Sequence, residues 1–408
     1  MIVRKIKASE LQRVQELASL AFEFPLTEDK ASQQLLEEMT QNPQSRHEAH
    51  WQSQWAAFED DDQTMMSSFA AIPYPIHFDG HTCGMVGIGG VSTFPPYRRR
   101  GGIRACFEAA LPEMYESGAV FSYLYPFSTA YYRKFGYEMC CDYKRWKLLI
   151  GMVPSTPLRG TALLVEEGNR MLEEIQAVYR VWQESYNMMV VGGDFEFNWV
   201  KKANPFKDQL YTYVYKAADG QPKAYASFQK ADDPDGRNLL CQRFLFTDPE
   251  GFHGLMNLFV SLAADHRYVT FDLPSSLDIT PLLPEWSMGA GHSEIIPRGM
   301  VRVVNVKEAL HLARTHGEGN LVLEIHDGFI PQNNGRFAVS FGAGSVREVS
   351  QTDAAPDATL PIQEFSRLIA GVYDISALPF LTDVMVHSSA EKLSGLFFQK
   401  PLCITEYF

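Results

Sequence analysis

Residues 91–104 constrain the fold of this chain more than any other segment. An extended stretch is followed by two prolines and a basic turn, in the order Val91-Ser92-Thr93, Pro95-Pro96, Arg98-Arg99-Arg100-Gly101-Gly102. Proline cannot donate to a β-ladder, so the strand ends there. Apolar residues then recur at helical spacing, namely Ile103, Phe107, Ala110, Leu111 and Met114. The segment therefore predicts a strand, a glycine-containing basic turn and an amphipathic helix.

The turn at residues 98–102 has the chemistry of a pyrophosphate site. The first backbone N–H groups of a helix have no partner within it, and they carry a partial positive charge. Glycine lets the backbone approach a phosphate closely, and arginines add charge-assisted hydrogen bonds. These features favour a diphosphate ligand at the start of the helix. The alternative is a solvated basic loop that binds nothing.

The segments around this turn indicate an α+β domain. Residues 65–74 and 83–94 are predicted to be the strands of a hairpin, with Asp79-Gly80 as the turn between them. Residues 120–125 have the apolar composition of a short buried strand. Residues 128–134 are predicted to form a compact turn or helix.

Two further expectations concern helices. A polar stretch leads to Trp51 and Trp55, and we expect a second helical region there. Pro112 lies inside the helix that follows the basic turn, where proline removes a hydrogen bond. A kink or an early end of that helix is therefore expected.

A length of 408 residues exceeds that of a usual single core, so more than one domain is expected. Residues 151–160 are rich in Pro, Gly and Thr and indicate one boundary, and residues 289–298 indicate another. The order of elements after the first boundary loosely echoes the first domain, which hints at a degenerate copy. The predicted domains are 1–150, 151–290 and 291–408.

The motif at residues 91–104 resembles that of the GNAT acetyltransferases, whose coenzyme turn reads [Q/R]-x-x-G-x-[G/A]. Arg98 and Gly101 match this turn, while Ile103 stands where Gly or Ala is usual. The resemblance is closer to the Eis family, which carries V-x-V-x-P-x-x-R-R-R-G followed by a bulky residue. Here Thr93 replaces the second Val, and Gly102 takes a place usually held by Leu or Ile.

A second motif and the layout of the chain extend the resemblance. Residues 132–137 are similar to the Y-x-[RK]-F-G-Y segment of that family. The three-part layout and the aromatic C-terminus also agree. The resemblance implies two tandem GNAT-like domains, each a mixed sheet flanked by helices, and a C-terminal α/β domain like sterol carrier protein.

The resemblance also implies roles for individual residues. Tyr132 would be the general acid, with Tyr131 as the alternative, and the C-terminal carboxylate of Phe408 would be the base, with Glu406 as the alternative. Glu28, Asp29 and Glu406 would bind cationic groups of the substrate. Acetyl-CoA, as co-substrate, would contact Val91, Ser92, Thr93, Arg99, Arg100, Gly101, Gly102, Ile103, Arg104, Phe127 and Ser128.

Composition narrows the partners. The formal net charge is −13, which disfavours nucleic acid and anionic membranes and favours a cationic amine. The early basic residues are not followed by a signal-peptide core, and no run of 18 apolar residues occurs, so a cytoplasmic protein is expected. The His and Cys spacings match no metal motif, and we expect no metal.

The expected function is transfer of an acetyl group to amines of a cationic small molecule, which the resemblance suggests is aminoglycoside- or polyamine-like. Acetylation of protein lysines is a second possibility. A lipid carrier without catalysis is a third, because the C-terminal domain resembles sterol carrier protein. The family also implies a homo-oligomer, specifically a homohexamer.

Overall fold

A computed structural model describes residues 1–26, 53–153, 155–192, 197–202, 204–287, 289–381 and 383–406. The chain divides into two compact units. Unit 1 comprises Met1–Cys140, Gly299–Lys400 and Glu406–Phe408, and unit 2 comprises Cys141–Arg298 and Pro401–Thr405. The first and last thirds of the sequence therefore fold together, and we describe each unit by itself.

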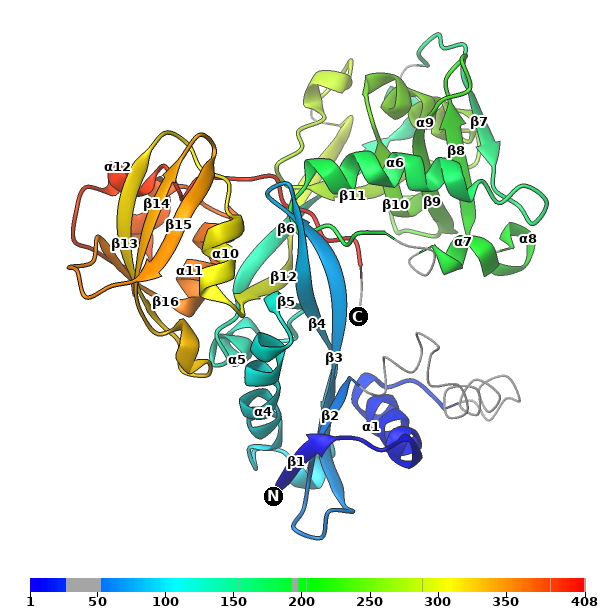
Figure 1. The fold of residues 1–408 in the computed structure, drawn as a ribbon. Helices are drawn as coiled ribbons and strands as arrows, with labels where there is room; N and C mark the ends of the chain where they lie inside the picture. Colours follow the sequence, from blue (N-terminus) through cyan, green and yellow to red (C-terminus); the bar gives the residue numbers. More distant parts are fainter. Residues whose placement is uncertain are drawn as a thin grey trace. The chain divides into compact units, whose positions relative to one another are not determined.

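In the first sheet of unit 1, an antiparallel meander is followed by a parallel pair of strands and then by a last antiparallel pair (Figure 1). Its neighbouring strands are β1 (Ile2–Lys5), β2 (Gln54–Phe58), β3 (Met65–Phe78), β4 (His81–Thr93), β5 (Ala119–Leu124) and the end of β12 (Gly291–Val303). The turn between β3 and β4 has φ of 49° at Asp79 and 91° at Gly80. Two successive positive φ values are those of a type I′ turn, so the predicted hairpin is confirmed.

Helices α1 (Leu11–Phe22) and α4 (Gly102–Glu116) cover opposite faces of this sheet. Trp55 and Ala57 of β2 pack in the cluster that contains the α4 residues, whereas Ala56 and Phe58 pack with α1. This alternation is the period of two of a strand. Figure 1 shows the two helices on either side of β2.

The structure corrects one of the two helix predictions and excludes one alternative of the other. Trp55 lies in strand β2 rather than in a helix, because alternate residues there fill two cores; Trp51 lies outside the described residues. Helix α4 runs on through Pro112 to Glu116, so it does not end early. Its buried side, which includes Leu111 before the proline and Met114 after it, stabilises it by packing.

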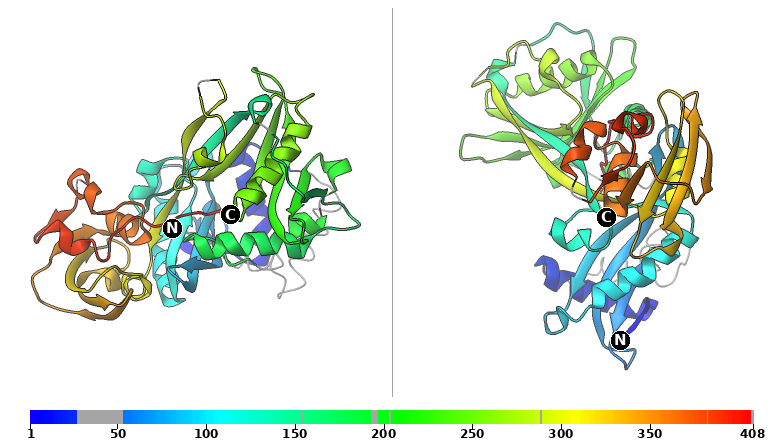
Figure 2. Two further views of the ribbon diagram at one scale, coloured as in Figure 1. Left: turned by 90° about the horizontal axis from the view of Figure 1, so that it is seen from above. Right: turned by 90° about the vertical axis from the view of Figure 1, so that its left-hand side faces the viewer.

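The second sheet of unit 1 lies in the C-terminal third of the chain. Its strand order is β15 (Ser345–Gln351), β14 (Gly335–Gly342), β13 (Gly319–His326), β16 (Ala358–Pro361) and β17 (Met385–Val386). The remaining helices of this region are α10 (Val306–Leu312), α11 (Ile362–Ala370) and α12 (Ala390–Leu393). Figure 2 shows these elements, in yellow to red, in two further orientations.

Unit 2 repeats part of the first sheet's topology. The order of its strands is β6 (Glu138–Leu149), β11 (Tyr268–Pro274), β10 (Asn238–Phe246), β9 (Pro222–Ala231), β8 (Tyr211–Lys216) and β7 (Thr161–Leu164). Its helices include α6 (Leu172–Ser185), α7 (Asn198–Lys202), α8 (Pro205–Asp208) and α9 (Pro249–Ser261). The pair β10–β11 is parallel and is joined through α9, as β4–β5 is joined through α4. The expected echo between the first and second parts is therefore present as a β–α–β unit.

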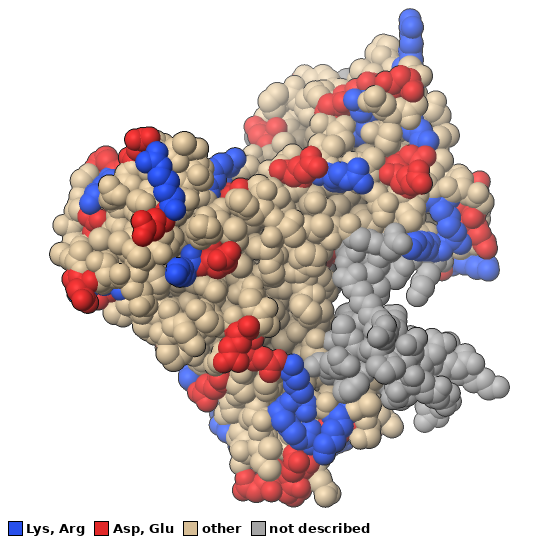
Figure 3. Space-filling model, viewed as in Figure 1, with Lys and Arg blue, Asp and Glu red and all other residues tan. Residues whose placement is uncertain are grey.

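The surface carries charges of both signs. On the face shown in Figure 3, acidic and basic side chains are interspersed rather than gathered into one large patch. None of the helices in the described part of the chain is long and apolar enough to cross a membrane.

Candidate functional site

The basic turn leads into the start of α4, where backbone N–H groups lack acceptors within the helix. Arg99 has a φ of 67° and Gly101 has a φ of 87°, so the turn twice enters the left-handed region. Gly101 is the N-cap residue, and it offers no side chain to satisfy the first N–H groups of the helix. Ala105 is the first residue whose N–H reaches back to the turn, donating to the Gly101 carbonyl at 3.0 Å.

The N–H groups of Gly102, Ile103 and Arg104 have no acceptor among the described residues. Helix geometry directs these three donors out of the N-terminus, where the helix dipole adds positive potential. The arrangement can therefore hold an anion, as the sequence predicted. The solvated-loop alternative accounts for the arginines but not for the free donors of an uncapped helix.

Gly102 is required by packing against strand β3. A Cβ atom at this position would lie 2.5 Å from Ser67 Oγ and 3.4 Å from Ala57 Cβ. Ser67 is fully buried and its hydroxyl lies 3.0 Å from that of Thr93. Glycine at position 102, where the resembling family usually has Leu or Ile, therefore brings the first turn of α4 close to the sheet. Thr93 supplies a hydroxyl beneath that turn.

Three of the four arginines at residues 98–104 differ in what they contact. Arg100 pairs with Glu59 at 3.2 Å and stacks over Tyr97, and Arg104 pairs with Glu108 at 3.7 Å. Arg99 is exposed and forms no ion pair with a described residue. Its guanidinium is thus available to a ligand at the turn.

Strands β4 and β5 separate beside the turn. Their parallel register ends at Ile88 and Leu124, although β4 continues to Thr93. A bulge in β4 contributes to this, since Gly90 has a φ of 62° and its carbonyl accepts a hydrogen bond from Ser92 Oγ at 3.0 Å. Beyond Ile88, the edge of β4 that faced β5 is open to an extended ligand, which could pair with it as an added strand. Val91, Ser92 and Thr93 lie on this stretch.

Tyr132 lies on the short helix α5 (Thr129–Arg133), directly after β5. Ser128 is the N-cap of α5, and its hydroxyl accepts from the Tyr131 N–H. The exposed ring of Phe127 contacts the rings of Tyr131 and Tyr132, with centroid distances of 5.3 and 5.4 Å. The predicted residues Phe127, Ser128 and Tyr132 thus lie together at the end of β5.

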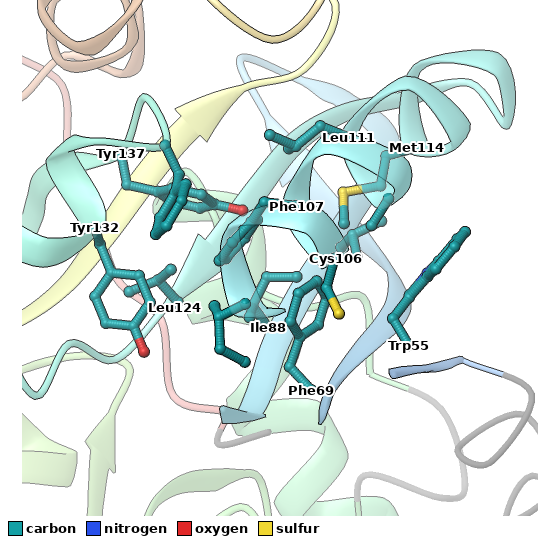
Figure 4. Packing of buried hydrophobic residues seen from close by; sticks show 14 of the residues in the cluster. Trp55, Phe69, Ile88, Cys106, Phe107, Leu111, Met114, Leu124, Tyr132 and Tyr137 are labelled. Carbon is teal, nitrogen blue, oxygen red and sulfur yellow. The ribbon is translucent and has the colours of Figure 1, made fainter. Parts of the chain in front are cut away.

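The environment of Tyr132 keeps its hydroxyl protonated. The residue is 2% exposed, and burial raises its pKa well above the usual value of 10.0. Figure 4 shows its oxygen directed away from Phe107 and Tyr137, and no hydrogen bond of this hydroxyl to a described residue is observed. Tyr137, in contrast, shares a hydrogen bond of 2.7 Å with Ser122 inside the core. A protonated phenol without a structural partner is suited to donating a proton.

The C-terminal tail reaches the same region of unit 1. The Tyr125 hydroxyl, at the end of β5, donates to the carbonyl of Glu406. Glu406 is therefore held at Tyr125, which precedes Tyr132 by seven positions in the sequence. The other predicted site residues, Glu28, Asp29 and Phe408, lie outside the described residues. Glu406 itself is half-buried, and its main chain rather than its carboxylate makes this contact.

Sequence reasoning missed two residues of this site, Ser67 and Tyr125. Ser67 lies under Gly102, and Tyr125 holds the tail. The only signal in the sequence for Ser67 was a pair of small polar residues, Ser67 and Ser68, among mostly apolar neighbours. Nothing near Tyr125 in sequence indicates its partner, because the partner lies 281 residues away.

Comparison with protein families assigns three segments of the chain. Residues 2–140 match a family described as acetyltransferase (GNAT) domain. Residues 195–303 match a second family with the same description, and residues 306–404 match a sterol carrier protein domain. Comparison with curated proteins finds no matching relative.

Solved structures share the fold over the full length of the chain. Eis1 from Mycobacterium abscessus is similar with a TM-score of 0.78 at 16% identity, with 100% of both chains covered. The chain therefore contains two GNAT acetyltransferase domains and a sterol carrier protein domain. The match to a conserved protein from Enterococcus faecalis V583, described as a probable N-acyltransferase, covers 100% of this chain and 99% of that one (TM-score 0.85, 21% identity). A GCN5-related N-acetyltransferase from Anabaena variabilis ATCC 29413 covers 100% of both chains (TM-score 0.83, 19% identity).

Proposed function

We propose that this Eis-like protein transfers acetyl from acetyl-CoA to the amines of a cationic small molecule, of the aminoglycoside or polyamine kind. The coenzyme diphosphate binds at Arg99–Arg104 and the pantetheine arm lies along Val91–Thr93. The amine attacks the thioester directly, Tyr132 protonates the thiolate that leaves, and the Phe408 carboxylate takes the proton of the amine. The single observation that carries the proposal is the uncapped start of α4 beside the separated strands β4 and β5.

The first GNAT domain is the one suited to the coenzyme. The corresponding helix of the second domain, α9, begins with Asp248, whose carboxylate accepts from the Gly251 N–H at 2.9 Å. Glu250 adds a second acid in its first turn. A carboxylate already occupying the helix N-terminus competes with a phosphate there, so a diphosphate is disfavoured.

Both proton transfers are chemically required. An alkylamine is mostly protonated at neutral pH, and it must lose a proton before it can attack, directly or through water. The leaving thiolate needs a proton from a group that is still protonated at neutral pH, and the raised pKa of Tyr132 meets that condition. The hold of Tyr125 on Glu406 supports the role of the tail, because two further residues span up to about 7 Å.

Removing the charge of Arg99 should weaken coenzyme binding without unfolding the protein. We expect Arg99→Gln to raise the Kd for acetyl-CoA roughly tenfold, since a charge-assisted hydrogen bond to phosphate contributes about 1.5–3 kcal/mol. Isothermal titration calorimetry measures this. The control is Arg180→Gln, the same change at an exposed position on α6. No heat with acetyl-CoA for the wild-type protein, or equal affinity for both variants, would contradict the proposed turn.

The base can be tested by moving the C-terminal carboxylate. Appending two glycines after Phe408 is expected to lower kcat at least tenfold while the Kd for acetyl-CoA stays unchanged. Glu406→Gln, which keeps the main-chain contact with Tyr125, is expected to change kcat little. The opposite pair of results would assign the base to Glu406.

Other readings of the function remain as proposals with their own tests. Acetylation of protein lysines is separated from small-molecule acetylation by mass spectrometry of peptide and amine acceptors offered side by side. Lipid binding without turnover would indicate a carrier.

We further propose domains at 1–150, 151–290 and 291–408 and a cytoplasmic homohexamer, which light scattering tests. We also propose that Glu28, Asp29 and Glu406 bind cationic groups of the substrate. Among the residues that the structure describes, no group of three or more His, Cys, Asp and Glu side chains is placed to hold a metal.

A further inference from the structure

The helix that carries Tyr132 is too short to hold its own position. Helix α5 has five residues, whereas isolated helices shorter than about 12 residues are marginal in water. Its last carbonyls have no partner inside the helix. The position of the Tyr132 hydroxyl therefore depends on what else contacts the segment from Ser128 to Tyr137.

Two of the carbonyls that follow Tyr132 accept hydrogen bonds from distant side chains of unit 1. Gln363 Nε2, in the first turn of α11, donates to the Arg133 carbonyl at 2.9 Å. Arg302 Nη1, at the end of β12, donates to the Phe135 carbonyl at 2.6 Å. These donors lie 230 and 167 residues away in sequence from the carbonyls that they hold.

Arg302 is itself fixed by a buried ion pair. Its side chain and that of Asp327 are both 0% exposed, and its second Nη atom lies 2.6 Å from each carboxylate oxygen of Asp327. Asp327 also accepts from the Phe329 N–H at 2.9 Å and from Asn333 Nδ2 at 2.9 Å. A buried pair with these additional hydrogen bonds is rigid, because each partner has little freedom to turn away.

Gly136 completes the contact. A Cβ atom at this position would lie 1.7 Å from Arg302 Nη1, and the residue has a φ of 86°. The guanidinium therefore occupies the space that any other residue at position 136 would fill. This gives a physical reason for glycine between Phe135 and Tyr137 that does not involve the coenzyme.

We infer that Arg302, Asp327 and Gln363 are positioning residues, through which the sterol carrier protein domain sets the location of Tyr132. Asp327 and Gln363 belong to the segment that matches that domain, and Arg302 lies just before it. The domain thus acts on catalysis through the main chain of residues 133–135, separately from any contribution of the C-terminal carboxylate. The inference rests on the proposed role of Tyr132.

The test uses Gln363→Glu in the full-length protein, because this change removes the donor while keeping the shape. We expect kcat to fall roughly tenfold from the loosened geometry, with KM for acetyl-CoA and Tm unchanged. Hydrogen–deuterium exchange of the peptide 128–137 should become faster. Gln351→Glu is the matched control: it makes the same change at an exposed position on β15 of the same domain.

Asp327→Asn provides a second variant, with a larger expected increase in exchange because Arg302 loses its counter-ion. Equal exchange and equal kcat for Gln363→Glu and Gln351→Glu would overturn the inference, whether or not Asp327→Asn folds. A wild-type protein without any acetyl transfer would instead refute the proposed function. The exchange measurement then still decides whether these residues hold α5.

Discussion

Replacing Tyr132 by phenylalanine is expected to lower kcat by at least about 100-fold, which is the lower end of what a positioned general acid contributes. The ring remains, so the contacts of Tyr132 with Phe127 and Tyr131 are kept. The hydroxyl has no observed partner among the described residues, so Tm should change little. In the proposed mode acetyl-CoA binds at α4 and β4, so its Kd should also be unchanged.

Tyr131→Phe is the control for this experiment, because it removes a hydroxyl from the neighbouring, half-buried ring of the same helix. Burial raises the pKa of Tyr131 as well, so protonation state alone does not distinguish the two tyrosines. We expect Tyr131→Phe to keep kcat within about threefold of wild type. A large loss for Tyr131→Phe together with near-normal activity for Tyr132→Phe would transfer the role to Tyr131.

Asp79→Asn is expected to cost the protein about 3–5 kcal/mol of unfolding free energy, the range for removing one partner of a buried ion pair. Lys400 and Asp79 form such a pair, and both side chains are 0% exposed. Asparagine also tolerates the left-handed conformation that Asp79 adopts, so backbone strain is not added. Chemical denaturation at pH 7 measures the loss.

The dependence on pH follows from Lys400. Burial lowers its pKa in the folded protein below the ordinary value of 10.5, although Asp79 opposes this shift. Without Asp79 the folded-state pKa falls further, while the unfolded chain keeps the proton up to about 10.5. Above the folded-state pKa of Lys400 in the variant, the folded protein releases the Lys400 proton while the unfolded chain keeps it. The free energy of unfolding of the variant therefore rises with pH in this range. The destabilisation by Asp79→Asn should therefore be smaller at pH 9 than at pH 7.

A double variant separates the charge from the packing. Asp79→Asn combined with Lys400→Met removes both charges and keeps an apolar side chain near the rings of Phe78 and Phe398. Part of the stability lost in the single variant should return, because no unpaired charge is left buried. A double variant that is less stable than Asp79→Asn would show that the pair itself contributes net stability.

Local features of the sequence predicted the local features of the site. The two prolines, the glycine turn and the apolar periodicity after it were sufficient to place the strand, the turn and helix α4, and Asp79-Gly80 predicted the hairpin. Trp55 was misassigned because a five-residue strand packed on both faces has no polar–apolar alternation to recognise. Periodicity is informative only where one face of an element is polar.

The tertiary contacts of the site were not predictable from the residues alone. The bond from Tyr125 to Glu406 and the bond from Arg302 to Phe135 join positions 281 and 167 apart. Ser67 and Gly102 meet through the packing of a helix on a sheet, which no spacing in the sequence encodes. The motif resemblance supplied the role of Tyr132, and the structure supplies the contacts that hold the helix on which it lies.

The two β–α–β units of the chain differ at the residue that begins the connecting helix. The connecting helix α4 begins at Gly101 and leaves its first backbone N–H groups free. The connecting helix α9 begins at Asp248, whose side chain accepts a hydrogen bond from one of its first N–H groups. A saturating titration should consequently reach a stoichiometry of one coenzyme molecule per polypeptide. The β–α–β unit that contains α9 can then accept substitutions that would abolish turnover in the unit that contains α4, provided that its packing is preserved.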